Sequence, residues 1–218
     1  MLIGIPVYDQ VDMLDVAGPH ELFSWANYDV ELVAAQRGAL TFRNGFSFNV
    51  ATSFAEARAY DVLWVPGGDP CALIKLMGDR TYLDFLKKMS GNAQFVASVC
   101  EGALLLAAAG LLDGYTVTTH WGFYPCMARF PKVTLASGYP RYCLDRNRLT
   151  GGGISSGLDE ALMLIQLVSG TEAAQQVQRS TQYYPRPPVA SEITPATTCL
   201  LDEVKCPPSG AAAAATGR

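Results

Sequence analysis

One stretch, residues 94–110 with the sequence QFVASVCEGALLLAAAG, constrains the fold more than any other part of this chain. Residues 95–99 form a short apolar run that predicts a buried strand. Residues 103–109 are strong helix formers and predict a buried helix. Only Cys100, Glu101 and Gly102 separate the two, so the chain must turn sharply from strand to helix. In open α/β folds such a turn lies at the carboxyl edge of the sheet, where ligands bind.

Cys100 at this turn is the candidate nucleophile. Gly102 allows the close approach that a tight elbow needs. A thiol at a helix N-terminus lies near unpaired N–H groups and the positive end of the helix dipole, which predicts a lowered thiol pKa. The alternative interpretation is an inert buried thiol, because cysteine is among the most buried residue types. The other cysteines lack such a setting, and we expect them to be inert.

Composition narrows the class of protein. A chain of 218 residues that is 50% hydrophobic suits one compact domain with a sizeable core. A net charge of -4 and a pI of about 5.1 do not favour binding to nucleic acid or to an anionic membrane. No apolar run reaches membrane-spanning length, and the first residues predict a strand rather than a signal peptide.

The cysteines also bear on where the protein works. The six cysteines stand far apart and contain no C-x-x-C pair. This spacing predicts neither a zinc site nor a disulfide framework. We therefore expect a protein of a reducing compartment, in the cytoplasm, with no bound metal.

Strands and helices alternate along the chain, which predicts a mostly parallel sheet covered on both faces by helices. Besides the elbow, the expected strands are residues 2–7, 30–34, 62–65, 115–119, 133–135 and 141–144, the last followed by a hairpin turn at residues 145–147. The expected helices are residues 20–26 with Pro19 at the first helical position, residues 53–57 capped by Ser53 or Thr52, and residues 79–89, 122–130, 158–169 and 171–180.

The chain shows one domain over residues 1–190 and a C-terminal extension over residues 191–218. No internal repeat and no long linker divides the first part. The extension follows a Pro-rich segment that begins at Tyr184. Its end, an alanine tract over residues 210–218, is expected to be frayed or disordered.

A cysteine nucleophile needs a partner for its proton, and the sequence offers few candidates. His120 ends a predicted strand at the same sheet edge as Cys100, although it equally suits a packing role. His20 falls in an early helix and is expected to be a surface or capping histidine. Asp15 follows a strand end, but a role in capping the next helix is also open. Glu101 adjoins Cys100, but an acid at a helix N-terminus that only complements the helix dipole is the alternative interpretation.

Glycines at the end of another central strand are candidate ligand contacts. Gly67 and Gly68 follow residues 62–65, and their backbone N–H groups could approach a ligand as an oxyanion hole requires. An ordinary glycine turn is the alternative. With His120 and Trp121 at the same edge, these residues are the candidate substrate-binding set.

Five motifs, taken in order, resemble the landmarks of the ThiJ/PfpI superfamily, relatives of the class I glutamine amidotransferases. They are residues 14–19 (LDVAGP), 65–68 (VPGG), 99–103 (VCEGA), 118–121 (TTHW) and 151–159 (GGGISSGLD). The resemblance covers about residues 2–190. The later segment 176–188 resembles one branch in particular, the isonitrile hydratases.

The resemblance implies a flavodoxin-like three-layer sandwich, a homodimer, and a reaction that needs no cofactor. It also implies that Cys100 is the nucleophile and that Asp15 lies beside its sulfur, with His120 in the pocket. One departure is clear: these hydratases carry threonine after the cysteine, where this chain has Glu101. A second carboxyl group there opposes thiolate formation if ionised, or donates a hydrogen bond if protonated.

The activity that this resemblance implies is hydration of an isonitrile to an N-substituted formamide, with Cys100 and Asp15 as catalytic groups and Glu101 as a further candidate. Two alternatives stay open. One is another activity of the superfamily, glyoxalase-like or chaperone-like. The other is a ligand-sensing domain related to AraC-type regulators, which carry a helix-turn-helix region that this acidic chain does not show. A peptidase is disfavoured, because Glu101 rather than histidine follows the cysteine.

Overall fold

The sheet is built around its most apolar strands. β6 (Val62–Val65) is buried along its whole length and pairs in parallel with β7 (Phe95–Ser98) on one side and with β1 (Leu2–Pro6) on the other. Apolar runs without polar alternation belong in a sheet that is covered on both faces. The computed structural model describes residues 1–207.

Seven strands form this sheet, in the order β10-β11-β7-β6-β1-β2-β5. All neighbouring pairs are parallel except β10 and β11, which form the antiparallel hairpin predicted at residues 145–147. The remaining strands of the sheet are β2 (Asp29–Ala34), β5 (Thr52–Ser53), β10 (Tyr142–Asp145) and β11 (Arg148–Gly151). Two smaller pairs are β3 (Gly38–Thr41) with β4 (Ser47–Val50), and β8 (Thr116–Val117) with β9 (Thr134–Leu135).

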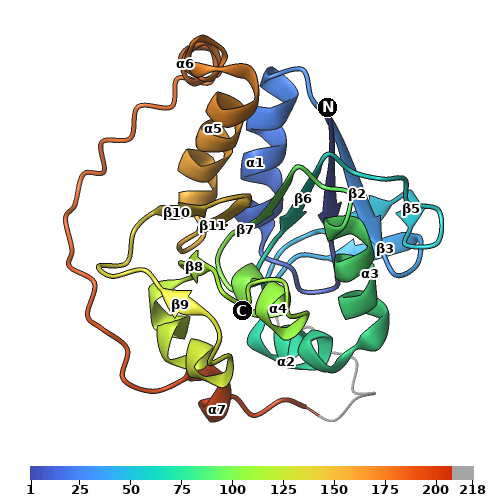
Figure 1. Ribbon diagram of the computed structural model, residues 1–218, viewed down its shortest axis with the longest axis vertical. Coiled ribbons are helices and arrows are strands. Elements are labelled where there is room, and N and C mark those ends of the chain that lie inside the picture. Colours follow the sequence, from blue (N-terminus) through green and yellow to red (C-terminus); the bar gives the residue numbers. More distant parts are fainter. Residues whose placement is uncertain (208–218) are drawn as a thin grey trace.

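Helices cover the sheet in two groups (Figure 1). One group packs together as α1 (Met13–Trp25), α5 (Ser156–Ser169) and α6 (Thr171–Ser180). The other consists of α2 (Pro70–Gly78), α3 (Arg80–Ser90) and α4 (Gly102–Ala108). The predicted flavodoxin-like sandwich with a mostly parallel central sheet is therefore confirmed.

The first helix begins earlier than the sequence predicted. A helix over residues 20–26 with Pro19 at its first position is wrong, because α1 starts at Met13 and contains Pro19. Proline has no N–H, so it leaves the carbonyl four residues earlier, that of Asp15, without a helical partner. The indole N–H of Trp64 donates to this carbonyl at 3.1 Å. A side chain from the central sheet thus replaces the missing helical hydrogen bond.

Other local predictions also need correction. The helix expected over residues 53–57 is wrong: Ser53 ends the short edge strand β5, and a turn follows in which Glu56 accepts hydrogen bonds from the Ser53 N–H and hydroxyl. These hydrogen bonds between Ser53 and Glu56 resemble those of a helix N-cap, but here they close a turn. The segment expected as a helix over residues 122–130 is a 3₁₀ helix, η1 (Trp121–Arg129). Helix α2, begun by the N-cap Asp69, was not predicted.

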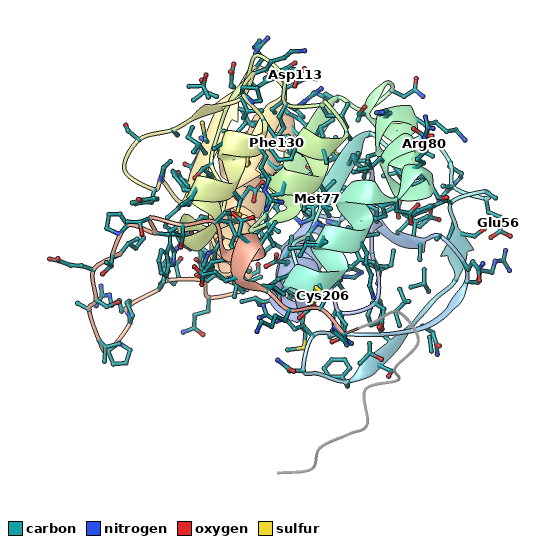
Figure 2. The ribbon with its side chains drawn as sticks, turned by 90° about the horizontal axis from the view of Figure 1, so that it is seen from below. Glu56, Met77, Arg80, Asp113, Phe130 and Cys206 are labelled. Carbon is teal, nitrogen blue, oxygen red and sulfur yellow. A yellow bond between two sulfur atoms is a disulfide. The ribbon has the colours of Figure 1, made fainter. Side chains whose placement is uncertain are left out.

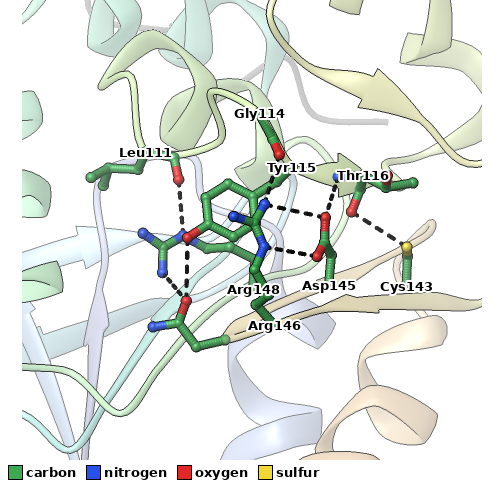
Figure 3. A network of polar contacts seen from close by, with 9 residues as sticks. Leu111, Gly114, Tyr115, Thr116, Cys143, Asp145, Arg146 and Arg148 are labelled. Atoms are coloured by element: carbon green, nitrogen blue, oxygen red, sulfur yellow. Dashed lines mark hydrogen bonds and ion pairs between the residues drawn. The ribbon is translucent and has the colours of Figure 1, made fainter.

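A network of polar contacts ties the β10–β11 hairpin to β8 (Figure 3). Asp145 accepts hydrogen bonds from the Thr116 N–H at 2.8 Å and from Arg146 Nε at 3.0 Å. The Arg146 guanidinium lies over the Tyr115 ring, with Cζ 3.7 Å from the ring centroid. Cys143 Sγ donates to the Thr116 carbonyl at 3.4 Å. These contacts fix β8, and with it the segment that leads to the candidate pocket.

The C-terminal extension returns to the sheet edge. Figure 1 shows the chain after α6 running along the outside of the molecule to α7 (Leu200–Glu203), which packs against η1 and α2. Two disulfides hold this segment, Cys126–Cys199 and Cys71–Cys206; Figure 2 labels Cys206 beside α2. The prediction of no disulfide framework is therefore wrong. The alanine tract over residues 210–218 lies outside the described residues.

The expectation of a reducing compartment rested on the lack of a disulfide pattern in the sequence. The two disulfides remove that support, because disulfides persist mainly in oxidising compartments. The cytoplasmic location stays a prediction. Within residues 1–207, no helix has both the length and the apolar character needed to cross a membrane.

Candidate active site

The turn at Cys100 has the sharp geometry that the sequence predicted. Cys100 adopts a left-handed conformation with φ of 56°, which is uncommon for a residue with a side chain. Its N–H donates to the Gly152 carbonyl at 2.8 Å, and its carbonyl accepts from the Thr119 hydroxyl at 2.7 Å. Gly102 packs directly on the Val65 carbonyl, where no side chain would fit. The surrounding elements therefore hold the strained residue in place.

Three carboxyl groups surround the Cys100 thiol. Asp15 comes from the first turn of α1, Asp12 is the N-cap residue of that helix, and Glu101 follows the cysteine directly. One carboxylate oxygen from each and the Cys100 sulfur all lie within 4.8 Å of one another. Asp15 and Cys100 are 0% exposed, and Glu101 is 3% exposed. The three catalytic candidates thus form one buried cluster, and the structure adds Asp12.

Asp15 is held in place by the edge of β6. Its Oδ2 accepts a hydrogen bond from the Gly67 N–H at 2.9 Å. Its Oδ1 is buried and has no hydrogen-bond partner among the described residues. A side chain at Gly67 would collide with the carboxylate and backbone nitrogen of Glu101 and with the Cβ of Cys100. Gly67 therefore positions Asp15 and makes room for Glu101, and its N–H is already occupied rather than free for a reaction intermediate.

Burial sets the ionisation of the cluster. The pKa of Asp15 lies well above its usual value because of burial, and the charges of Glu101 and Asp12 raise it further. Burial raises the pKa of Glu101 to about 7. The pKa of the Cys100 thiol is also raised well above its usual value by burial and by both carboxylates. The lowered thiol pKa expected from the helix N-terminus is therefore wrong, since desolvation outweighs the dipole.

A cavity of about 420 Å³ opens in front of this cluster. Both polar and apolar side chains line it, and its walls include residues of α2, η1, the β3–β4 hairpin and the C-terminal segment. Its lining residues are Asp12, Arg43, Pro70, Glu101, His120, Phe123, Ile154, Leu200, Glu203 and Val204. Cys100 itself lies behind Glu101 and Ile154.

The predicted substrate-binding residues do not all reach this cavity. His120 lines it, and also lines a neighbouring cavity of about 340 Å³ to which Trp121 belongs. Gly67 and Gly68 line neither; Gly68 packs against the Gln10 carbonyl. His20 forms its contacts with Ser24 on α1, which agrees with a surface or capping role.

His120 is a neutral ring at physiological pH. Its Nδ1 accepts a hydrogen bond from the Gly122 N–H at 3.1 Å, so the proton of the neutral ring is on Nε2. Burial lowers the pKa of His120, and the nearby Arg43 cation lowers it further. Gly153 leaves the space that the imidazole fills.

Sequence reasoning missed two residues of the site besides Asp12. Arg43, in the turn after β3, lines the cavity and lies 3.6 Å from Asp12 through Nη1 and Oδ1. The backbone of Ile154 forms a hydrogen bond that favours the Cys100 thiolate and partly offsets the raised pKa of the thiol. Asp12 gave a signal, since a residue three positions before Asp15 shares its side of a helix. Ile154 lies in the motif at residues 151–159, although that motif did not point to a contact with Cys100. Arg43 reaches the site by tertiary folding alone.

The Asp12, Asp15, Cys100 and Glu101 cluster is also the set of side chains that could approach a metal ion. Burial raises the pKa of Asp15 and of the Cys100 thiol, and both groups would have to give up a proton to bind a metal ion.

The sheet order and the buried cysteine at its edge define a flavodoxin-like α/β protein with a cysteine elbow. The profile of the DJ-1/PfpI family matches residues 1–166, well over half of the chain. The chain belongs to the DJ-1/PfpI family.

Three similar proteins refine this placement. The chain is 36% identical over 205 residues to the isonitrile hydratase of Pseudomonas putida, across 93% of this chain and 88% of that protein. It is 32% identical to the HTH-type transcriptional regulator GbdR of Pseudomonas aeruginosa, across 83% of this chain and 50% of the regulator. A ThiJ/PfpI family protein from Pseudomonas syringae is 31% identical, with a TM-score of 0.80 over 86% of this chain and 77% of that one. The resemblance predicted from the motifs is therefore confirmed.

Proposed function

We propose that this protein hydrates an isonitrile, R–NC, to the N-substituted formamide, with Cys100 as the nucleophile. The observation that carries the proposal is the buried cluster in which the Cys100 sulfur lies within 4.8 Å of carboxylate oxygens from Asp15 and Glu101. The similarity to the Pseudomonas putida isonitrile hydratase supports this choice of reaction. The reaction adds water and is redox-neutral, so it requires no cofactor.

In the first step, the Cys100 sulfur attacks the terminal carbon of the isonitrile. A C–S bond forms, the carbon receives a proton, and a thioimidate, R–N=CH–S–Cys, results. The thiol loses its own proton, so the net change is that the sulfur and one hydrogen both add to the terminal carbon. The raised thiol pKa means that the sulfur stays protonated until substrate arrives. A nearby group must accept the thiol proton as the C–S bond forms.

The two carboxyl groups suit different parts of this proton transfer. Glu101, with a pKa of about 7, is partly ionised at neutral pH and can accept the thiol proton. Burial raises the pKa of Asp15 well above its usual value, which favours the protonated form that can donate to the carbon. A site that holds one carboxyl group ionised and another protonated supplies a base and an acid together. The two carboxyl groups form one coupled system, so protons move within the pair.

In the second step, water adds to the thioimidate carbon. The carboxylate left after proton donation can take a proton from this water as the C–O bond forms. The imine nitrogen takes the proton that Glu101 accepted in the first step. The C–S bond then breaks, the new hydroxyl group gives its proton to the sulfur, and the formamide R–NH–CHO leaves. The enzyme returns to its starting protonation state, and the sum of both steps is one water molecule added to the isonitrile.

The test is purified protein incubated with an aliphatic and an aromatic isonitrile, followed by mass spectrometry for formamide. We expect formamide from wild type and none from Cys100→Ser, since a serine hydroxyl is hardly ionised without a dedicated base. The matched control is Cys143→Ser, a free cysteine outside the pocket, which should retain turnover. Near-normal turnover by Cys100→Ser would refute the role of Cys100.

The similarity to GbdR favours one second candidate, a ligand-sensing role. Under that function, wild type would bind a small molecule without converting it. Binding of an isonitrile detected by calorimetry, with no formamide formed by wild type, would favour sensing over hydration.

A further inference from the structure

The C-terminal segment over residues 199–206 is covalently fixed at both ends. Cys199 is bonded to Cys126 of η1, with 4.6 Å between their Cα atoms. Cys206 is bonded to Cys71 in the first turn of α2, with 5.4 Å between Cα atoms. Both partners lie in elements that begin close to the Cys100 turn: α2 follows β6, and η1 follows Thr119, whose hydroxyl donates to the Cys100 carbonyl. The segment therefore spans the space in front of this turn as a strap.

The two anchor points lie beside the Cys100 cavity. Cys71 follows Pro70, which lines the cavity, and Cys126 shares η1 with Phe123, which also lines it. The strap itself contributes Leu200, Glu203 and Val204 to the lining. Its own helix, α7, is only four residues long, too short to be stable alone.

Other contacts orient the strap with its apolar side inward. Leu201 is buried, and Leu200 packs against η1 close to Gly122. On the outer side, Asp202 forms an ion pair with Arg129. Both side chains of that ion pair are substantially exposed, so the ion pair stabilises the position of the strap much less than the disulfides do.

We propose that the disulfide-anchored strap, residues 199–206, forms the outer wall of the Cys100 cavity and determines which isonitriles reach the sulfur. The substrate part of this inference rests on the proposed function. Leu200 and Val204 face the space in which the substituent R must lie. The cavity of about 420 Å³ is near the small end of ligand sites, so the strap selects compact, apolar substituents.

The same construction makes access to Cys100 dependent on the disulfides. A dithiol that reduces one disulfide is itself oxidised to a disulfide, and the two cysteine sulfurs each gain one electron and one proton. With both bonds reduced, the strap is held by noncovalent contacts, chiefly the packing of α7 and Leu201 and the exposed ion pair. We expect it to open locally more often, which lets a reagent reach Glu101 and Ile154 in the cavity and, past them, Cys100.

Thiol alkylation tests whether the strap covers the cavity in front of Cys100, and it requires no catalytic turnover. The variants are Cys126→Ser with Cys199→Ser, Cys71→Ser with Cys206→Ser, and all four together. Each is treated with iodoacetamide and with a bulky maleimide, and alkylation of Cys100 is followed by peptide mass spectrometry. Cys143, which is half-buried and donates a hydrogen bond to the Thr116 carbonyl, is the internal reference thiol.

We expect the ratio of Cys100 to Cys143 alkylation to rise on the order of tenfold in the fourfold variant, and more for the bulky reagent. An unchanged ratio would overturn the proposal. So would a parallel rise at both thiols, since that indicates general unfolding.

A second measurement tests selection by the strap without touching the disulfides. Leu200→Ala enlarges the cavity, and we expect the KM for a bulky isonitrile to fall while the KM for a small one changes little. Equal changes for both substrates would overturn the role of the wall in selection. If wild type converts no isonitrile, the proposed function fails, yet the alkylation experiment still decides whether the strap covers Cys100.

Discussion

The indole N–H of Trp64 donates a hydrogen bond to the backbone carbonyl of Asp15 at 3.1 Å. This carbonyl is the one that Pro19 leaves without a partner in α1. Three residues after Trp64, the Gly67 N–H donates to the Asp15 carboxylate at 2.9 Å. The end of β6 therefore fixes both the backbone and the carboxyl group of the residue that faces Cys100.

The first prediction concerns this contact. Trp64→Phe should lower the free energy of unfolding by about 1–3 kcal/mol through the buried carbonyl left unpaired, in addition to the loss from the smaller ring. Restoring an N–H with Pro19→Ala offers the carbonyl a helical donor. In that background Trp64→Phe should cost about 1 kcal/mol less, measured by a double-mutant cycle in denaturant. The exposed Trp25→Phe is the control, and strictly additive costs would contradict the proposed replacement.

The second prediction concerns the Asp15 side chain. Asp15→Asn keeps the shape, and its amide oxygen can still accept from the Gly67 N–H, but it has no proton to donate. We expect kcat to fall by about 10²–10⁴-fold, the usual contribution of general acid–base catalysis. Asp29→Asn, an exposed change on β2, should leave kcat unaltered. An unimpaired Asp15→Asn enzyme would exclude Asp15 from proton transfer.

Much of this arrangement could be predicted from the sequence, because local patterns carried it. The apolar runs of β6 and β7 and the short link at Cys100 predicted the sheet and the elbow. Parallel strands then placed Cys100 and Asp15 at one edge, whereas His120 reaches it from β8, which lies outside the seven-stranded sheet. In contrast, Pro19 suggested a helix start, because its acceptance inside α1 depends on Trp64, a residue distant in the sequence.

The rest of the site depends on distant contacts that no local pattern encodes. Cys71 and Cys206 are separated by 135 positions, and Cys126 and Cys199 by 73, so their spacing gave no sign of pairing. The thiol pKa was expected to fall because the helix terminus was visible in the sequence. Its burial and the two carboxyl neighbours, which reverse the direction, emerge only in the folded chain.

The third prediction concerns assembly. The family resemblance implies a homodimer, and we propose that this chain forms one. Light scattering at micromolar concentration should give twice the 23.4 kDa mass of the chain. A particle of the chain mass alone across that concentration range would refute the dimer.

The fourth prediction concerns Glu160 of α5, which is fully buried against Gly151 of β11. Burial raises its pKa well above the usual 4.5, and the charge of Asp15 adds to this. A raised folded-state pKa gives stability that is complete below the unfolded pKa and is lost as pH rises toward the folded value. Wild type should therefore lose stability relative to Glu160→Gln above pH 4.5, by at most about 1.4 kcal/mol per pH unit.

Denaturant unfolding at a series of pH values measures this difference. Because the other buried acids are common to both proteins, the comparison isolates Glu160. The exposed Glu192→Gln serves as the control and should track wild type. A constant difference between wild type and Glu160→Gln at all pH values would show that Glu160 has no shifted pKa.

The last prediction separates two roles of Glu101, the residue that replaces the threonine of the hydratases it resembles. Its pKa of about 7 places an ionisation in the working range. If the ionised form accepts the thiol proton, kcat/KM of wild type should rise as pH increases through about 7. In Glu101→Gln that limb should disappear, and activity should fall by about 10²–10⁴-fold. Glu203→Gln, which changes another carboxyl group of the cavity lining, should keep the limb.

Stability gives an independent check on the same variant. The raised folded-state pKa of Glu101 means that its stabilising effect is complete below pH 4.5 and is lost as pH rises to about 7. Glu101→Gln should therefore gain stability over wild type across this range. A residue that only complements the α4 dipole predicts the opposite, a loss of about 0.3–1 kcal/mol with kinetics unchanged. Glu101→Thr decides the chemistry: higher isonitrile turnover in that variant would mean that Glu101 serves a different substrate, whereas a loss comparable to Glu101→Gln assigns the carboxyl group to hydration.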